Sequence, residues 1–281
     1  MMKRFADDDR SEEQIREHYE LEKKLATRLR NSTREERRLL YSEVYEELYS
    51  TLTHHPRHRL SQSPQQVAAH VKSQMVILQP FLKGGMTVLE VGPGACRTLS
   101  AVASQVSRAI GVEVAASTTS REGFPSNLEL LEFDGTKLPL PDASVDLAYS
   151  MAVMEHLHPD DAIEQLRSIA RVLKAGGLYV LYTPHRYRGP GDVSKYFDDV
   201  ATGFHLKEWT CRELKSAMEQ AGFTDVSEIV PFKGRTVLVP MGWVVVPELV
   251  IGMFPAAQRR RIAQYWAVER VLNIRLVGRI G

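Results

Sequence analysis

The chain has little cysteine and little net charge. Its 281 residues include two cysteines, Cys96 and Cys211, and neither has a metal-binding partner close by in the sequence. A disulfide framework and a cysteine-based zinc site are therefore excluded, and we expect reduced thiols in a cytoplasmic protein. The formal net charge of +1 gives no overall field that would attract nucleic acid, so no nucleic-acid partner is expected.

The sequence also lacks a long uninterrupted apolar run. Residues 236–254 are almost wholly apolar, but they are broken by Pro240, Gly242, Pro247, Glu248 and Gly252. A membrane-spanning helix needs about 20 apolar residues without such breaks, so we expect no transmembrane segment. The chain begins MMKRFADDD, which lacks the apolar core of a signal peptide.

The most informative segment that is present is residues 88–96, with the sequence VLEVGPGAC. An apolar run contains Glu90 near its end, and Gly92 and Gly94 follow directly. This pattern predicts a strand, a tight turn and a helix, with glycines that let the backbone approach a ligand closely. Because a sharp turn alone would explain two glycines, the function has to be inferred from the segments that follow.

Carboxylates recur at the ends of the next apolar segments. Glu113 closes residues 109–113 and stands 21 residues after Gly92. A βαβ nucleotide-binding unit carries at this distance the acid that accepts a hydrogen bond from a ribose hydroxyl. Asp134 closes residues 130–134 another 21 residues on, where it would accept a hydrogen bond from an amine such as that of adenine. One such acid would suggest only a helix cap, but several in order at this spacing favour a nucleotide-like ligand.

With these motifs the chain resembles a class I S-adenosylmethionine-dependent methyltransferase of the small-molecule and quinone-biosynthesis kind. Residues 90–94 match the E-x-G-x-G loop of this family, whereas a dinucleotide-binding dehydrogenase would carry a glycine where Arg97 stands. The resemblance implies S-adenosylmethionine as the cofactor. It also implies an α/β fold with a doubly wound, Rossmann-like sheet of seven strands, mostly parallel with an antiparallel edge strand. The cofactor-binding residues that it implies are Glu90, Gly92, Pro93, Gly94, Glu113, Asp134, Gly135 and Ser150.

The sequence divides into three parts. We predict an N-terminal helical cap at 1–62, the methyltransferase domain at 63–240 and an apolar and basic helical extension at 241–281. In the first part leucines recur at helical spacing, and a capping box can form at Ser32–Glu35 or at Thr33–Glu36. These helices either only cover the core or also roof the substrate site, and the resemblance favours the roof.

The C-terminal part supports two interpretations. Arg259, Arg260 and Arg261 open an amphipathic helix, whose apolar residues are Ile262, Tyr265, Trp266, Leu272 and Leu276. This helix would either pack on the sheet with its arginines in solvent or make shallow contact with a membrane surface. The second interpretation would suit a lipid or quinone substrate.

Histidines are the predicted catalytic residues. A hydroxyl group that accepts a methyl group must lose its proton to a base, and the pKa of histidine lies near the working pH. His156 follows the fourth strand, His185 follows the fifth, and His205 lies in the long connection at 184–209. His156 ranks first because it resembles the Glu-His pair of quinone-type O-methyltransferases, although each histidine could instead hold loop backbone. No metal site is expected, since the histidines of residues 54–58 have no acid or thiol to complete a ligand set.

The resemblance implies methyl transfer to a small, mostly apolar molecule by in-line displacement, with oxygen favoured as acceptor and carbon or nitrogen left open. Ser150-Met151-Ala152-Val153 stands where amino-methylating nucleic-acid enzymes carry Asn- or Asp-Pro-Pro-aromatic. The nucleophilic cysteine of cytosine-C5 enzymes is missing there as well. Two alternatives stay open: a non-catalytic S-adenosylmethionine-binding module, and a methyltransferase that modifies RNA or protein.

Overall fold

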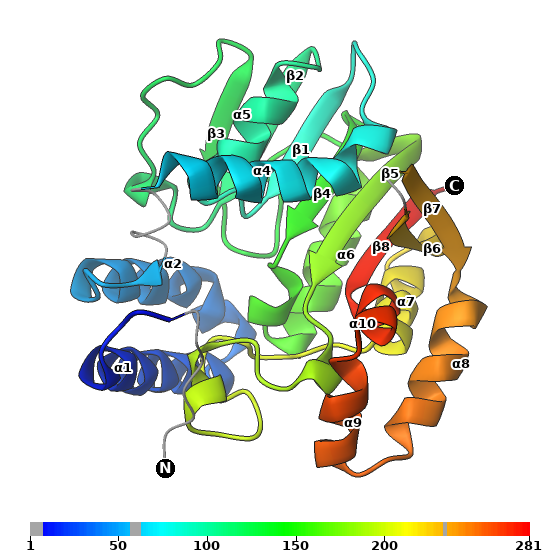
Figure 1. The fold of residues 1–281 in the computed structure, drawn as a ribbon. Helices are drawn as coiled ribbons and strands as arrows, with labels where there is room; N and C mark the ends of the chain where they lie inside the picture. Colours follow the sequence, from blue (N-terminus) through cyan, green and yellow to red (C-terminus); the bar gives the residue numbers. More distant parts are fainter. Residues whose placement is uncertain (1–7, 57–62, 233–234) are drawn as a thin grey trace.

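A sheet of eight strands forms the centre of the computed structural model, which describes residues 8–56, 63–232 and 235–281 (Figure 1). The strand order is β3-β2-β1-β4-β5-β8-β6-β7. Strands β1 to β5 run parallel, β8 is antiparallel to both β5 and β6, and β7 is antiparallel to β6. The predicted α/β, doubly wound, Rossmann-like class is therefore confirmed. The strands are β1 (Thr87–Val91), β2 (Arg108–Glu113), β3 (Leu128–Glu132), β4 (Val145–Met151), β5 (Leu173–Thr183), β6 (Phe223–Phe232), β7 (Arg235–Pro240) and β8 (Ile274–Ile280).

The predicted number of seven strands was wrong, because residues near the C-terminus form β8 instead of continuing a helix. Leu272 and Leu276 have helical spacing, which favoured one helix through both. The helix instead ends with an extended backbone at Asn273, and Ile274 and Leu276 enter the core as alternate residues of a strand. In the sheet, β8 lies between β5 and β6. This position is covered on both faces of the sheet, and a short apolar strand fits it because its side chains are buried on both faces.

Helices cover both faces of the sheet (Figure 1). One face carries α4 (Pro64–Leu78) and α5 (Arg97–Ala103), and the other carries α6 (Pro159–Val172) and α7 (Cys211–Gln220). Alternate residues of each strand enter the two cores, as the twofold period of a strand requires. In β1, Val88 lies in the core with α4 and α5, whereas Leu89 and Val91 lie in the core with α6 and α7.

Two N-terminal helices lie beyond the end of the sheet at which the parallel strands finish (Figure 1). They are α1 (Glu12–Asn31) and α2 (Arg34–Thr51). Each begins with a capping box, Ser11 with Gln14 in α1 and Thr33 with Glu36 in α2. The box in α2 is one of the two that the sequence allowed.

A buried ion pair fixes α2 against α6. Asp161 is fully buried, and its two carboxylate oxygens accept hydrogen bonds from Arg37 at 2.5 and 2.9 Å. The Tyr41 hydroxyl also donates to Asp161, at 2.8 Å, and accepts the backbone N–H of His158. A buried charge needs such partners, because desolvation costs several kcal/mol per ion. The pair therefore gives the N-terminal helices one defined position on the domain.

Three helices connect β7 to β8: α8 (Met241–Gly252), α9 (Ala256–Ala263) and α10 (Trp266–Leu272). Among the described residues, no helix has both the length and the apolar character needed to cross a bilayer. Short 3-10 helices occur in the connections: η1 (Gln79–Phe81), η2 (Ala116–Thr118), η3 (Met154–His156), η4 (Arg186–Arg188) and η5 (Val193–Tyr196). The last two lie in the long connection that follows β5.

Removing one partner of the buried pair should destabilise the protein much more than removing an exposed pair beside it. Asp161→Asn leaves the buried Arg37 without its counter-charge, and we expect a loss of about 3–5 kcal/mol in the free energy of unfolding. The neighbouring Arg38 makes a more exposed pair with Glu164 at 3.0 Å, and Arg38→Gln should cost about 1 kcal/mol or less. Urea denaturation measures the free energy of unfolding of both variants. Similar losses in the two variants would contradict the role of Asp161 in fixing α2 against α6.

Candidate functional site

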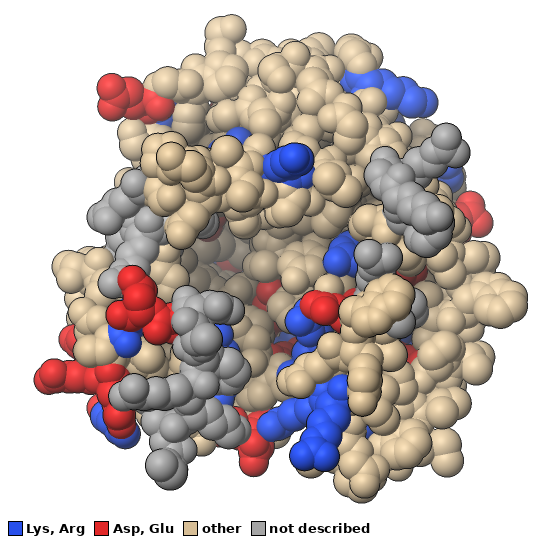
Figure 2. All heavy atoms as spheres, in the orientation of Figure 1, with Lys and Arg blue, Asp and Glu red and all other residues tan. Residues whose placement is uncertain are grey.

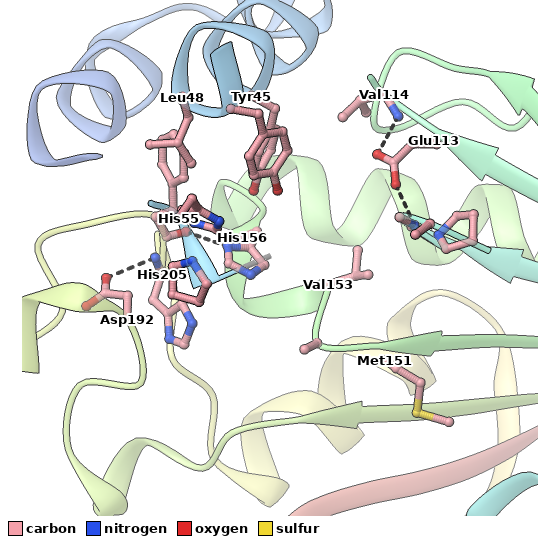
Figure 3. A pocket seen from close by; sticks show the side chains of 18 of the residues that line it. Tyr45, Leu48, His55, Glu113, Val114, Met151, Val153, His156, Asp192 and His205 are labelled. Carbon is pink, nitrogen blue, oxygen red and sulfur yellow. Dashed lines mark hydrogen bonds between the residues drawn. The ribbon is translucent and has the colours of Figure 1, made fainter. Parts of the chain in front are cut away.

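A cavity of about 940 Å³ lies between α2 and the carboxyl ends of the parallel strands. Its walls come from the loops after β1, β2, β3 and β4, from α2 and from the connection after β5 (Figure 3). The order of the strands reverses between β1 and β4, and open α/β sheets bind ligands beside such a reversal, at the carboxyl ends. In the space-filling view the molecule is hollowed below α4 (Figure 2).

The loop after β1 brings bare backbone to the cavity wall. Gly92 has a φ of +69°, and a Cβ at this position would lie 2.6 Å from Cγ2 of Val153. Gly94 also has a positive φ, and Pro93 lies between the two glycines. All three residues line the cavity, and the two glycines have a backbone conformation that glycine adopts without strain. A ligand can therefore approach the main chain of this loop directly.

Glu90 is a buried carboxyl in the same wall. Its Oε2 accepts a hydrogen bond from the Tyr149 hydroxyl at 2.8 Å. Burial raises the pKa of Glu90 to about 8 despite this hydrogen bond, and the charge of Glu113 contributes to the increase. The carboxyl is therefore mostly protonated at neutral pH, and a cation bound in the cavity would favour its ionised form.

Glu113 stands at the end of β2 with its carboxylate in the cavity wall (Figure 3). Its Oε2 accepts the backbone N–H of Gly94 and its Oε1 accepts that of Val114, each at 2.9 Å. These two bonds fix the orientation of the carboxylate, and each oxygen keeps acceptor capacity for a ligand. A carboxylate held in this way can accept hydrogen bonds from the two hydroxyls of a ribose.

Gly135 and Asp134 differ in their access to the cavity. Gly135 lines it with a φ of +87°, and a Cβ there would lie 2.8 Å from the ring of Tyr41. Asp134 is not among the lining residues. Its Oδ1 accepts the backbone N–H groups of Thr136 and Lys137, at 2.8 and 2.7 Å, and so closes the turn after β3. In this structure Asp134 therefore shapes the loop that presents Gly135.

Ser150 is turned away from the cavity. Its side chain is fully buried, and its hydroxyl lies 2.7 Å from that of Tyr179. Neighbouring side chains of a strand point to opposite faces, so Ser150 points to the face opposite that of Tyr149 and Met151. Met151, one residue further on, does line the cavity.

Two of the three predicted catalytic histidines meet across the cavity from Glu113 (Figure 3). The ring centroids of His156 and His205 are 5.1 Å apart, edge to face. Nδ1 of His156 lies 3.1 Å from the backbone oxygen of Phe204. Because a carbonyl oxygen only accepts, Nδ1 carries the proton and Nε2 is the atom that can take up another.

The two imidazoles have opposite pKa shifts. Burial lowers the pKa of His156, and the adjacent His205 lowers it further, although the Glu155 carboxylate opposes both effects. Burial alone would also lower the pKa of His205, but the hydrogen bond to Glu208 at 3.1 Å and the charges of Glu155 and Asp192 outweigh it. The pKa of His205 is therefore raised. Consequently His205 keeps a proton to higher pH than His156, so His156 is the histidine present in the neutral form, which can accept a proton, over the wider pH range.

His185 lies outside the residues that line the cavity. It is fully buried, its Nε2 is 2.7 Å from Oε1 of Glu248, and its Nδ1 accepts the backbone N–H of Tyr187. Glu248 belongs to α8, so the pair joins the loop after β5 to the C-terminal helices. Both ring nitrogens are engaged, and the structure does not bring His185 to the other two histidines.

Within the part of the chain that the structure describes, two groups of side chains have donor atoms close enough together to hold a metal ion. Within each group these atoms lie within 4.8 Å of one another, and the groups are Glu155 with His156 and His205, and His185 with Cys211 and Glu248. In the first group Oε1 of Glu155 is buried without a hydrogen-bond partner among the described residues. Two imidazoles and a carboxylate would suit zinc or ferrous iron. In the second group Glu248 already accepts hydrogen bonds from two backbone N–H groups.

The resemblance favoured N-terminal helices that roof the substrate site, but the residues of α2 that line the cavity were not predicted. Tyr41, Tyr45 and Leu48 line it from one face of the helix, at the spacing of three and four residues that marks such a face. Among the aromatic residues at the end of β5 and in the connection after it, Tyr182, Tyr196 and Phe204 line the cavity, whereas Tyr187, Phe197 and Trp209 do not. His55 of the histidine-rich segment also lines the cavity, whereas Arg57 and His58 lie outside the described residues.

Known proteins resemble this chain in sequence and in fold. Residues 89–181 match the family model of a methyltransferase domain. A probable S-adenosylmethionine-dependent methyltransferase of Mycobacterium tuberculosis is 36% identical over 151 residues, which are 52% of this chain and 52% of that protein. The chain thus spans about half the length of the curated relatives it matches.

Solved structures share the fold at low sequence identity. An S-adenosylmethionine-dependent methyltransferase from Mesorhizobium loti has a TM-score of 0.51 at 18% identity, covering 76% of this chain and 99% of that one. Phosphoethanolamine N-methyltransferase 1 of Haemonchus contortus has a TM-score of 0.57 at 16% identity, covering 88% of this chain and 50% of that one. The fold, the glycine loop and the sequence relatives agree with the family and the cofactor predicted from the motifs. The chain carries a class I S-adenosylmethionine-dependent methyltransferase domain.

Proposed function

We propose that this protein transfers a methyl group from S-adenosylmethionine to a small molecule held beside His156. The observation that carries the proposal is the single cavity that joins the glycine loop and Glu113 to the His156–His205 pair. A volume of about 940 Å³ is large enough for a cofactor and a small acceptor together. The acceptor would therefore meet the cofactor inside one site.

The cofactor would occupy the side of the cavity formed by the loops after β1, β2 and β3. Glu113 would accept hydrogen bonds from the ribose hydroxyls, and the backbone at Gly92 and Gly94 would lie against the methionyl portion. Arg97 also lines the cavity and would attract the methionyl carboxylate. Phe133 and Gly135 would flank the adenine, with Asp134 supporting their loop.

The chemistry is an in-line displacement, for which the bound cofactor supplies an electrophilic methyl group. His156 would accept the proton of the acceptor hydroxyl at Nε2 as the new oxygen–carbon bond forms. His205, held by Glu208, would keep the ring of His156 in place and favour its neutral form. Alignment of the reacting atoms at about 3 Å accounts for much of the rate in such a site.

The acceptor is proposed to be a small molecule with an apolar portion and a hydroxyl. The apolar portion would lie against Tyr45, Leu48 and Tyr49, and the hydroxyl would face the His156–His205 pair. Carbon and nitrogen acceptors remain alternatives, since the structural neighbour from Haemonchus contortus is a phosphoethanolamine N-methyltransferase.

Glu113→Ala should weaken cofactor binding at least about tenfold, because hydrogen bonds to a charged group contribute about 1.5–3 kcal/mol. Calorimetric titration with S-adenosylmethionine and S-adenosylhomocysteine measures the change. Glu132→Ala is the matched control, since Glu132 pairs in register with Glu113 on β3 but is exposed outside the cavity lining. Equal binding by both variants, or no binding by the folded wild type, would contradict the placement of the cofactor.

The affinity for S-adenosylmethionine relative to S-adenosylhomocysteine should rise from about pH 7 to about pH 9. The methylated form carries one more positive charge, which favours the ionised state of Glu90. Glu90 has a pKa of about 8 and so loses its proton within this window as the pH rises. Titrations at both pH values should show a severalfold rise in the wild type, which Glu90→Gln abolishes. The same rise in Glu90→Gln would assign the effect to another group.

His156→Gln should lower kcat by about 10²–10⁴-fold while cofactor affinity stays unchanged. Acceptors for this assay come from screening phenols, quinones and lipids with radiolabelled cofactor. The kcat of the wild type should rise as the pH passes through the lowered pKa of His156. The kcat of His156→Gln should not show this rise. His158→Asn is the control, because His158 lies outside the cavity lining and its ring only caps α6.

Chelation provides an independent check on this base. If EDTA abolishes turnover and zinc or ferrous iron restores it, His156 acts as a metal ligand with Glu155 and His205 rather than as the base. Turnover that survives EDTA while His156→Gln fails supports the proton-transfer role.

A further inference from the structure

Helix α8 is apolar on two opposite faces. Its buried face is formed by Met241, Val244, Glu248 and Ile251, which pack on the domain. Its outer face has the same spacing and consists of Trp243, Val246, Val250 and Met253. A helix that is apolar all round is normally buried all round, in a protein core or in a membrane. The outer face therefore calls for a covering partner.

The exposure of this outer face is large. Trp243 is 76% exposed, Val246 61%, Val250 53% and Met253 85%. Leu249 and Phe254 extend the surface at 46% and 41%. We call these six residues the α8 apolar face. Contiguous apolar patches of this kind on a protein surface mark interaction sites.

Among the residues that the structure describes, no charged side chain interrupts the α8 apolar face. From residue 236 to residue 258 the one charged residue is Glu248, which is buried and bound to His185. The space-filling view shows the same feature, an uncharged surface over α8 (Figure 2). The face itself therefore offers no ion pair that would fix the register of a protein partner on it.

Arginines border the face at one end. Arg259, Arg260 and Arg261 follow directly in α9, and Figure 2 shows basic side chains gathered where α9 lies. Arg261 is exposed, whereas Arg259 lies over the ring of Tyr187 and Arg260 bonds to Asp199. Trp266, 71% exposed, begins the next helix. Apolar and tryptophan side chains bordered by arginines are the pattern of a surface that inserts shallowly into a bilayer.

We propose that the α8 apolar face docks this protein on the surface of an anionic lipid bilayer. Trp243 and Met253 insert at the boundary between headgroups and acyl chains, and the arginines of α9 bind lipid phosphates. Because Arg259, Arg260 and Arg261 are positively charged, binding to an anionic membrane is favoured over binding to a neutral one. The protruding side chains of a single helix favour a soft bilayer over a protein partner, whose anchors usually fill a preformed pocket.

Docking in this way would place the membrane close to the rim of the cavity. Arg260 in α9 contacts the loop after β5, with its Nε 3.1 Å from where a Cβ on Gly189 would stand. Two residues further on, Gly191 and Asp192 line the cavity. A bilayer-resident acceptor would therefore have a short path to the site. The docking itself is independent of the methyl-transfer proposal, because it needs no cofactor.

Vesicle co-sedimentation of the full chain without cofactor tests the proposal. The vesicles are phosphatidylcholine alone or phosphatidylcholine with about one-third phosphatidylglycerol. We expect binding to the anionic vesicles, with a roughly tenfold or larger loss in Trp243→Ser from the lost apolar burial. Arg261→Gln should weaken binding about fivefold. The tryptophan fluorescence of the wild type should shift to shorter wavelength on binding, as Trp243 moves out of water. Trp209 is already buried and should contribute a constant signal.

Matched controls come from exposed residues elsewhere. Leu39 on α2 is 73% exposed, and Leu39→Ser should bind vesicles as the wild type does. Arg108 on β2 is an exposed arginine, and Arg108→Gln should also leave binding unchanged. Light scattering after size exclusion gives the oligomeric state of each variant, and circular dichroism checks its folding.

Three results would overturn the proposal. The first is wild-type protein that binds neither vesicle. The second is vesicle binding that Trp243→Ser and Leu39→Ser reduce equally. The third is a wild-type dimer that Trp243→Ser converts to a monomer without any vesicle binding, which would assign the face to a second copy of the chain.

Discussion

The buried ion pair between Arg37 and Asp161 is the interaction on which the enclosed site depends. The reversal of strand order between β1 and β4 supplies an open crevice, and α2 closes this crevice only if it has a fixed position. Asp161 holds α2 through Arg37 and through Tyr41, whose ring lies against Gly135 in the cavity wall. One hydrogen-bonded carboxylate thus links the N-terminal helices, the loop after β3 and the start of α6.

The enclosed cavity has different electrostatic properties at its two sides. Glu90 and Glu113 lie on the side of the glycine loop. Burial and the charge of Glu113 raise the pKa of Glu90 and keep it mostly protonated, and a bound cation would favour its ionised form. The opposite side carries His156 and His205, with carboxylates behind them. A positively charged methyl donor is favoured on the first side, and proton acceptance is favoured on the second. The two sides together suit transfer of a methyl group to a nucleophile that must lose a proton.

The parts of the site that depend on local sequence could be predicted, and the parts that depend on long-range packing could not. The glycine turn and Glu113 follow from a strand, a turn and a fixed spacing, which a sequence displays directly. Asp134 has the expected spacing, but its carboxylate bonds to the two residues that follow the turn and does not line the cavity. The proximity of His156 and His205 depends on the path of the connection after β5, which has no periodic pattern. His185 lies between these two histidines in the sequence but binds Glu248 of α8. The residues around His185 in the sequence do not predict this contact. The eighth strand was missed for a similar reason, since its pairing partners rather than its leucine spacing decide its conformation.

A crystal structure of the protein with S-adenosylhomocysteine tests the central claim most directly. The account predicts that the ribose hydroxyls bind the carboxylate of Glu113 and that the sulfur faces the space in front of Nε2 of His156. The adenine is expected beside Phe133 and Gly135. A ligand whose ribose lies away from Glu113, or whose sulfur is separated from His156 by the cavity wall, would contradict it.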